Sequence, residues 1–248
     1  MIKVDIGNSV ANITLNRPEK RNALSPELIA ELTAAFLEAV PDKSINVIVI
    51  RGEGRDFCAG LDIKSATDSD QVLDHLASAR ALADLFLSMR RCSKPIIAAV
   101  HGRAIGGGAG LATAADLVVA TESSIFRYPE VNLGFVAAVV EPLLRRVVGE
   151  KRAFEMVAIG EPIPVAAAHA LGLVNRIYPD EEFETRVREF AAMLAAKSPS
   201  ALALTKELLH HVDGMTLEGA VNAGVYVNAL ARMTPDARRG FAQFVDKS

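Results

Sequence analysis

Two short, almost continuous apolar runs constrain the fold of this 248-residue chain more than any other feature. Residues 45–50 read INVIVI and residues 95–100 read PIIAAV. Strands that are apolar on both sides suit a sheet covered on both faces, which is the usual position of parallel strands. A helical pattern precedes each run: residues 25–40 open with a Ser-Pro-Glu start signal, and residues 69–90, between the two runs, carry a regular apolar stripe. The sequence therefore predicts a parallel α/β core.

The second half of the chain differs from the first. Further strands are predicted at residues 10–15 and 117–120, but from Lys151 onward the pattern is helical throughout. The expected C-terminal helices cover residues 181–197, 199–211, 216–233 and 235–247. We place a boundary in the Ser-Pro-Ser turn, so that residues 1–197 form the α/β core with the binding site and residues 198–248 form a helical region.

Composition narrows the function classes. With 27 Lys and Arg against 30 Asp and Glu, the chain lacks the basic excess of proteins that bind nucleic acids or anionic membranes. Two cysteines exclude a disulfide scaffold and a four-cysteine zinc site, and no histidine pair has metal-ligand spacing. We therefore expect no metal. No apolar run reaches the ~18 residues of a membrane span, and the first residues lack signal-peptide features, so we expect a cytoplasmic protein.

A glycine-rich segment at residues 102–110 follows the second apolar run and precedes an apolar helical stretch. The free backbone N–H groups of such a helix start can hold an anion or a developing oxyanion. The segment is not a Walker loop, because residues 107–109 read GGA where that loop has Gly-Lys-Ser/Thr. It is not a dinucleotide fingerprint either, because Leu111 stands where the third glycine of the fingerprint belongs. The alternative is a tight turn that allows close helix packing, and the glycines taken alone favour it.

A second turn, at residues 57–64, follows the first apolar run. Because α/β sheets bind ligands at the carboxyl ends of their strands, the two turns would each direct one N–H to a shared carbonyl oxygen. The alternative is an ordinary loop in which Asp62 makes local backbone hydrogen bonds. Glu130 lies in a mostly apolar stretch, where desolvation would raise its pKa and suit it to proton transfer. A solvated surface carboxylate is the alternative.

These segments resemble, in order and spacing, the motifs of the enoyl-CoA hydratase/isomerase (crotonase) family. The resemblance extends over essentially the whole chain. The matching segments are ITLNRP at 13–18 with NAL at 22–24, RGEG at 51–54 with FCAGLD at 57–62, residues 94–111 with Asp116, residues 126–134, and Gly160 with residues 167–168 and 171–174.

The resemblance implies a spiral of ββα units with C-terminal helices that assemble a homotrimer or a dimer of trimers. It also implies an acyl-CoA thioester substrate and no separate cofactor. Two backbone N–H groups, which match Leu61 and Gly107, are expected to hold the thioester oxygen and stabilise an enolate. Positions expected to contact the substrate or its CoA are Lys20, Arg21, Ala23, Ala59, Asp62, Ile63, Lys64, Gly106, Phe244 and Lys247. For Lys20 and Arg21, solvated surface charges are an equally good explanation.

One departure from the family pattern affects the mechanism. Family hydratases use two glutamates, of which Glu130 matches one, whereas Gly110 stands at the position of the other. Glycine cannot act on a proton. Glu141 is a candidate for the missing group, or it is an acid at a helix start beside Pro142.

Three functions therefore compete. The first, which we favour from the sequence, is an enoyl-CoA hydratase or dehydratase with Glu130 as its acid–base group and an unorthodox partner. The second is a double-bond isomerase, for which one carboxylate suffices. The third is a non-catalytic acyl-CoA binding protein, although such a protein has no use for a desolvated acid.

Overall fold

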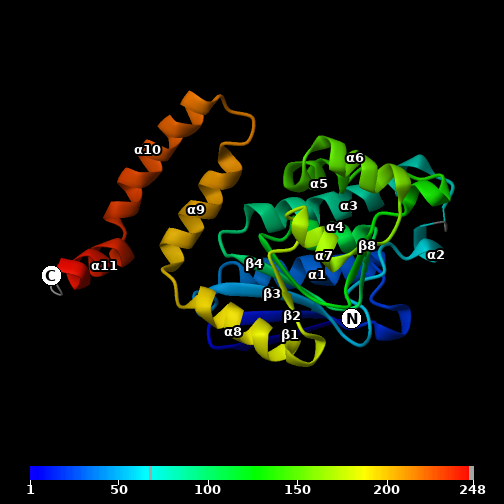
Figure 1. Ribbon diagram of the computed structural model, residues 1–248, viewed down its shortest axis with the longest axis horizontal. Helices are drawn as coiled ribbons and strands as arrows, with labels where there is room; N and C mark the ends of the chain where they lie inside the picture. Colours follow the sequence, from blue (N-terminus) through cyan, green and yellow to red (C-terminus); the bar gives the residue numbers. More distant parts are fainter. Residues whose placement is uncertain (67–68, 246–248) are drawn as a thin grey trace.

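The computed structural model describes residues 1–66 and 69–245, and its core is a six-stranded sheet (Figure 1). The strand order is β1-β2-β3-β4-β6-β9, where β1 pairs antiparallel with β2 and all other pairs are parallel. The strands are β1 (Ile2–Gly7), β2 (Val10–Leu15), β3 (Val47–Gly52), β4 (Ile96–Val100), β6 (Leu117–Thr121) and β9 (Arg176–Tyr178). The predicted parallel α/β core is confirmed.

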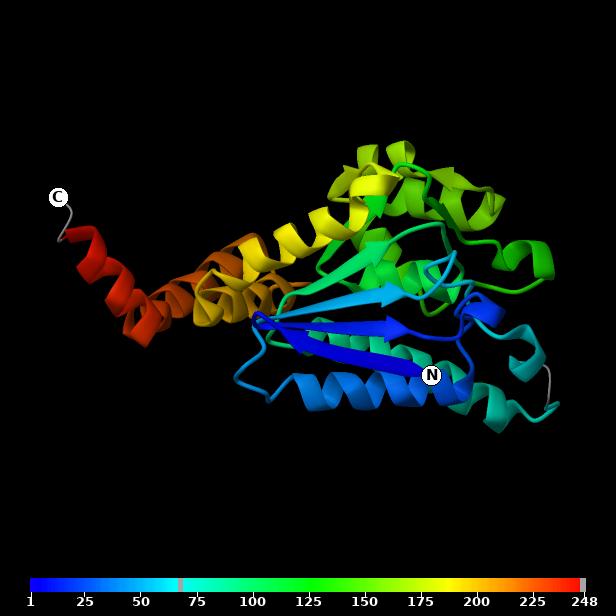
Figure 2. The same ribbon diagram turned by 90° about the horizontal axis from the view of Figure 1, so that it is seen from below.

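The two apolar runs have the two-sided burial that their sequence predicts. In β3, Ile48 and Ile50 pack in the larger core cluster, whereas Val47 and Val49 pack in a second cluster on the other face of the sheet. The helix α1 (Pro26–Ala39) covers the first face, and α8 (Phe183–Ala195) covers the second (Figure 2).

Short strands are where the sequence analysis fails. A second sheet joins β5 (Arg103–Ile105), β7 (Ile125–Arg127) and β8 (Ile163–Pro164). Because β8 and β9 lie beyond Lys151, the prediction that this part is helical throughout is wrong. Strands of two or three residues show no period that could be recognised. The N-terminal strand β1 was also missed, because it is an edge strand with five exposed positions.

The remaining elements connect and cover the sheets. In the described residues they are α2 (Ile63–Ala66), α3 (Val72–Arg91), α4 (Gly107–Ala114), α5 (Glu141–Val148), α6 (Glu150–Ile159), α7 (Val165–Ala170), α9 (Pro199–His211), α10 (Leu217–Met233), α11 (Pro235–Val245), and the 3-10 helices η1 (Pro18–Lys20), η2 (Glu130–Leu133) and η3 (Asp180–Glu182). In this described part, no helix is both long and apolar enough to cross a membrane.

The topology brings several loops to one end of the sheet. The arrows of β2, β3 and β4 all point toward the end where the cyan α2 lies (Figure 2). The loops that follow these strands therefore meet at the same edge, as the sequence predicts for its two candidate turns.

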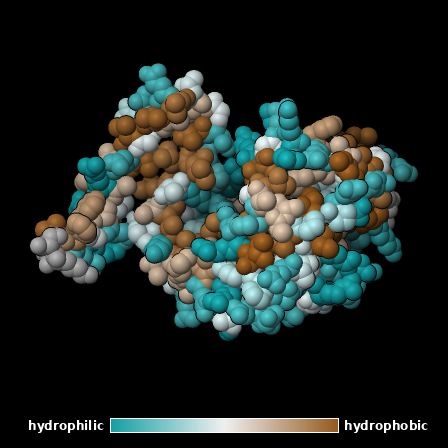
Figure 3. All heavy atoms as spheres, in the orientation of Figure 1, coloured by the Kyte–Doolittle hydropathy of each residue, from teal (hydrophilic) through white to brown (hydrophobic). Residues whose placement is uncertain are grey.

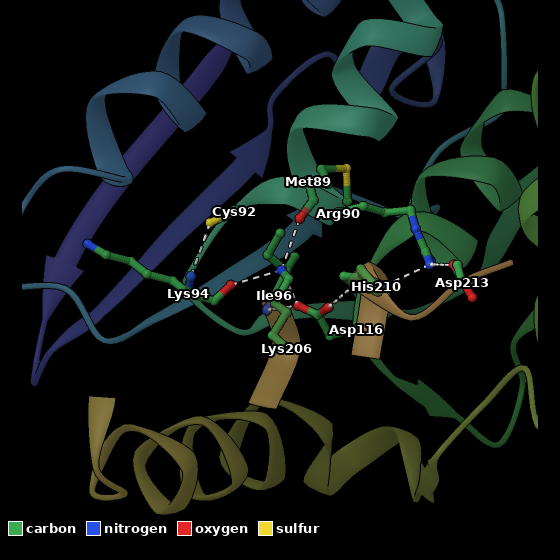
Figure 4. Close-up of polar contacts among 9 residues, drawn as sticks. All are labelled: Met89, Arg90, Cys92, Lys94, Ile96, Asp116, Lys206, His210 and Asp213. Atoms are coloured by element: carbon green, nitrogen blue, oxygen red, sulfur yellow. Dashed lines mark hydrogen bonds and ion pairs between the residues drawn. The ribbon is translucent and has the colours of Figure 1, made fainter. Parts of the chain in front are cut away.

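The helices α9, α10 and α11 extend away from the core (Figure 1), and a buried ion pair attaches α9 to the sheet. Lys206 is only 7% exposed, and its Nζ donates to Asp116 Oδ2 at 2.6 Å and to two backbone carbonyls (Figure 4). Asp116 also accepts from the N–H of Ile96 at 2.8 Å, so the carboxylate connects α9 with β4. Near the C-terminal end of α9, His210 Nδ1 accepts a hydrogen bond at 2.8 Å from Arg90, which lies on α3.

Substituting Lys206 with Met tests this attachment. Removing one partner of a buried ion pair leaves the other uncompensated, so we expect Lys206→Met to lower the free energy of unfolding by ~3–5 kcal/mol. The measurement is urea unfolding, with Lys151→Met on an exposed lysine as the matched control. A Lys206→Met variant as stable as the control would contradict a stabilising role for the pair.

Candidate functional site

The Leu61 N–H is left unused by the loop that carries it. Leu24 donates to the carbonyl of Gly60 at 2.7 Å and accepts from the N–H of Asp62 at 3.0 Å. These two hydrogen bonds flank Leu61, and no described residue accepts from its own N–H. The loop therefore presents one free donor with a fixed direction.

The second free donor is the N–H of Gly107, the first residue of α4. The first N–H groups of a helix have no carbonyl in a preceding turn, and no described residue accepts from this one. The residue before it is held, since the Gly106 N–H donates to the carbonyl of Arg127 at 2.8 Å. The helix start is thus anchored with its first donor exposed to the site.

A close backbone contact brings these two donors together. Gly60 has φ of +91°, and a Cβ placed on it would lie 2.7 Å from the carbonyl oxygen of Ile105 and 3.4 Å from the nitrogen of Gly107. Only glycine fits this position. A Cβ placed on Gly107 would in turn lie 3.8 Å from the nitrogen of Leu61. The structure therefore places the two predicted turns side by side.

Glu130 faces the same helix start. It is the first residue of η2, and its Oε1 lies 3.0 Å from the position that a Cβ on Gly106 would occupy. Its Oε2 is buried and has no hydrogen-bond partner in the described structure. Burial raises the pKa of the Glu130 carboxyl above its usual range, since water is removed from the charged form. The apolar setting expected from the sequence is thus present.

The position of the absent second glutamate is filled by other side chains. A Cβ on Gly110 would lie 2.5 Å from Cγ2 of Val140 and 3.0 Å from the ring of Phe86. Both of these side chains are buried. Sequence patterns gave no sign that Val140 packs here, because it precedes α5 in an irregular loop. There is consequently no room for a larger side chain at Gly110.

Glu141 is the first residue of α5 and stands directly before Pro142, as a helix-start acid does. It is half-buried, and no described side chain pairs with its carboxylate. A second acid–base role for Glu141 stays a prediction.

Most expected substrate-binding residues lie around the two donors. The carbonyl of Arg21 accepts from the N–H of Ala59 at 2.9 Å, so the segment of Lys20 and Arg21 borders the loop that leads to Leu61. Ala23 precedes Leu24 in the same segment. Ile63 and Lys64 are exposed on α2, immediately after Asp62. The Asp62 carboxylate itself pairs with Arg17.

The C-terminal candidates are placed differently. Phe244 is exposed on α11, which lies at the opposite end of the molecule from α2 (Figure 1). The structure does not bring Phe244 together with the other candidates within one chain. Lys247 lies outside the described residues.

Sequence analysis did not identify a basic cavity beside Ala59. It has a volume of about 370 Å³ and lies against the second sheet. Arg103 in its wall binds the Asp56 carboxylate through Nε at 2.7 Å and Nη2 at 3.0 Å. Burial opposes ionisation of Asp56, but the contacts with Arg103 outweigh it and lower the pKa of this carboxyl. Arg21 and Arg127 also line the cavity.

Comparison with known proteins gives consistent matches over the whole chain. A family model described as enoyl-CoA hydratase/isomerase matches residues 5–248. A Thermus thermophilus protein that is provisionally named enoyl-CoA hydratase is 39% identical over 249 residues, covering 100% of this chain and 98% of that protein. The 2,3-dehydroadipyl-CoA hydratase of Escherichia coli is 34% identical over 237 residues, covering 95% of this chain and 91% of that protein.

Solved structures agree. The crystal structure of an enoyl-CoA hydratase from Mycobacterium smegmatis superposes with a TM-score of 0.96 at 32% identity, covering 99% of this chain and 96% of that chain. This match confirms the fold class predicted from the sequence, an α/β core of this type followed by a helical C-terminal region.

Gly110→Ala tests the crowding at this position. The added methyl group would press on Val140, and overpacking of this kind costs about 1–3 kcal/mol of stability. If Val140 is shortened as well, the space opens, so the double variant Gly110→Ala/Val140→Ala should be more stable than the sum of the single effects predicts. A double-mutant cycle from urea unfolding measures the coupling, and strictly additive effects would show that the two side chains do not compete for this space.

Proposed function

Because the chain belongs to the enoyl-CoA hydratase/isomerase (crotonase) family, we propose that it binds an enoyl-CoA thioester and that Glu130 exchanges protons with the acyl group. In this proposal the thioester oxygen accepts hydrogen bonds from the N–H groups of Leu61 and Gly107. The thioester brings its own CoA, and no further cofactor takes part.

The two free donors support the binding of an oxyanion. When a proton leaves the carbon next to a thioester, negative charge moves onto the carbonyl oxygen. Backbone N–H groups that are already fixed stabilise this charge without reorganising, and each donor of this kind contributes ~10²–10³ in rate. Leu61 and Gly107 have donors that no described group occupies, and the close contact at Gly60 sets their spacing.

The environment of Glu130 supports its role as the acid–base group. Its raised pKa brings the protonated and ionised forms closer in free energy near neutral pH, as a group that takes up and returns a proton requires. The partnerless Oε2 is available to a substrate. A protein that only binds acyl-CoA gains nothing from burying a carboxylate in this way.

The crowding at Gly110 is the observation that favours one of the two reactions. A second carboxylate has no space there, so the site supports best a reaction that one carboxylate completes. In double-bond isomerisation, Glu130 removes a proton from C2 of a 3-enoyl-CoA, which leaves a dienolate on the thioester. The neutral acid then returns the proton to C4, and the product is the 2-enoyl-CoA.

Hydration is the second candidate, and it was the favoured function from the sequence alone. The relatives' names support it. Water addition needs one group that activates water and one that protonates C2. Glu130 would perform both steps in succession, or Glu141 would supply the second group.

Incubation of 3-enoyl- and 2-enoyl-CoA substrates in heavy water, followed by mass spectrometry, distinguishes these reactions. We expect 3-enoyl-CoA to become 2-enoyl-CoA without the mass of an added water. Glu130→Gln should lower kcat on the order of 10²–10⁴-fold while binding persists, because the amide cannot accept the proton. A hydrated product would contradict isomerisation, and full activity of Glu130→Gln would contradict the role of Glu130.

The pH dependence of kcat/KM gives an independent check. The base must be ionised in the free enzyme, and burial raises its pKa. Activity should therefore fall as the pH decreases through a value above the ordinary glutamate pKa of about 4.3. In the Glu130→Gln variant, kcat/KM should be low and should no longer show this decrease at acid pH. An inflection at or below the ordinary value in the unmodified enzyme would show that Glu130 is not the titrating base.

We also propose that α10 mediates the assembly of a homotrimer or a dimer of trimers. Apolar side chains at a helical spacing of four, Leu217, Val221 and Val225, are exposed on it, as are Leu230 and Met233. Brown, apolar surface covers much of the region formed by α9 and α10 (Figure 3). Exposed apolar patches of this kind mark protein–protein contacts.

Sedimentation analysis tests the assembly. We expect the unmodified protein to sediment as a trimer or hexamer, and Val225→Glu to shift it toward the monomer, because the new charge would be buried without a partner. Leu37→Glu, on an equally exposed leucine of α1, is the matched control and should not change the assembly. A monomeric unmodified protein would contradict the proposal.

A further inference from the structure

Arg17 and Asp62 form a mostly buried ion pair beside the loop that carries the free N–H of Leu61. Arg17 Nη1 lies 2.8 Å from Asp62 Oδ2, and the side chains are only 18% and 16% exposed. The same Nη1 donates to the carbonyl of Ala23 at 3.1 Å. The guanidinium group thus links the Ala23 carbonyl to Asp62, which lies 45 residues beyond Arg17 in the sequence.

Asn22 fixes the base of the same arrangement. Its side chain is fully buried, accepts from the N–H of Arg17 at 2.9 Å and donates to the carbonyl of Asp56 at 2.8 Å. The segment from Arg17 to Leu24 is therefore attached to the loop of Leu61 at both of its ends.

The ion pair lies next to the pair of backbone hydrogen bonds through which Leu24 holds the peptides on either side of Leu61. The peptides before and after Leu61 bind Leu24, which directly follows Ala23. Asp62 directly follows Leu61, and its carboxylate also accepts from the backbone N–H groups of Lys64 and Ser65 at the start of α2. A shift of either Ala23 or Asp62 would rotate the Leu61 peptide.

We propose that Arg17 is a positioning residue that aims the Leu61 N–H at the thioester oxygen, by holding Asp62 and the Ala23 carbonyl together. This inference rests on the proposed function, and it gives Asp62 a partner inside the protein in place of the direct substrate contact expected from the sequence. Oxyanion donors act only within about 2.7–3.1 Å of the oxygen, so a small rotation weakens them in the transition state more than it weakens binding.

The variants Arg17→Gln, Arg17→Lys and Asp62→Asn test this role. Two readouts are used: the split between kcat and KM, and the absorbance of a bound conjugated dienoyl-CoA. Hydrogen bonds to the thioester oxygen polarise the conjugated system and shift its absorbance to longer wavelength. This shift reports on the donors without turnover.

We expect Arg17→Gln to lower kcat by about 10-fold or more, a part of the ~10²–10³ effect of losing one donor, with little change in KM. The absorbance shift should shrink in parallel. Arg17→Lys keeps the positive charge but lacks the planar guanidinium group, so it should recover part of kcat and part of the absorbance shift. Asp62→Asn should reproduce Arg17→Gln, and the double variant should be no worse than either single one, because both remove the same contact.

The outcomes separate this inference from the proposed function. If the unmodified protein produces no absorbance shift, the proposed function is overturned and the role of Arg17 with it. A second outcome is that the unmodified protein produces the shift, and that the Arg17→Gln and Asp62→Asn variants fold and keep both the shift and kcat. In that case only the positioning role is overturned. Arg152→Gln, which breaks an exposed ion pair on α6, is the matched control and should change neither readout. If Arg17→Gln fails to fold, Arg17→Lys and Asp62→Asn decide the question by the same readouts.

Discussion

The close contact between the loop at Gly60 and the start of α4 is the constraint on which the rest of the site depends. The carbonyl oxygen of Ile105 in β5 and the nitrogen of Gly107 in α4 approach Gly60 so closely that no side chain fits there. This contact is possible because β3 and β4 pair in parallel and therefore end at the same edge of the sheet. It places the Leu61 and Gly107 donors together, and Glu130 reaches the same place across Gly106.

The interior around this contact determines what chemistry is available. Val140 and Phe86 fill the space beside Gly110, and Glu130 is the carboxylate that lies against the helix start at Gly106. Burial of that carboxylate raises its pKa. The Arg17–Asp62 pair ties the residue after Leu61 to the Ala23 carbonyl.

Features set by local sequence were predictable. The helix at residues 199–211 begins and ends where Pro199 and the apolar pattern place it, and the buried strands were found within two residues of their bounds. Motifs likewise indicated Leu61, Gly107 and Glu130, which the fold brings into one region. Features set by packing between distant segments were not predictable. No periodicity reveals that Val140 fills the space beside Gly110, or that Arg17 pairs with Asp62 across 45 residues. The strands β5, β7 and β8 exist only through their pairing with each other.

The most direct test of this account is a crystal structure of the protein with an unreactive acyl-CoA bound. The account predicts that the thioester oxygen lies within about 2.7–3.1 Å of the backbone nitrogens of both Leu61 and Gly107, with C2 of the acyl group facing the Glu130 carboxylate. A thioester oxygen bound elsewhere, or an acyl group directed away from Glu130, would contradict it.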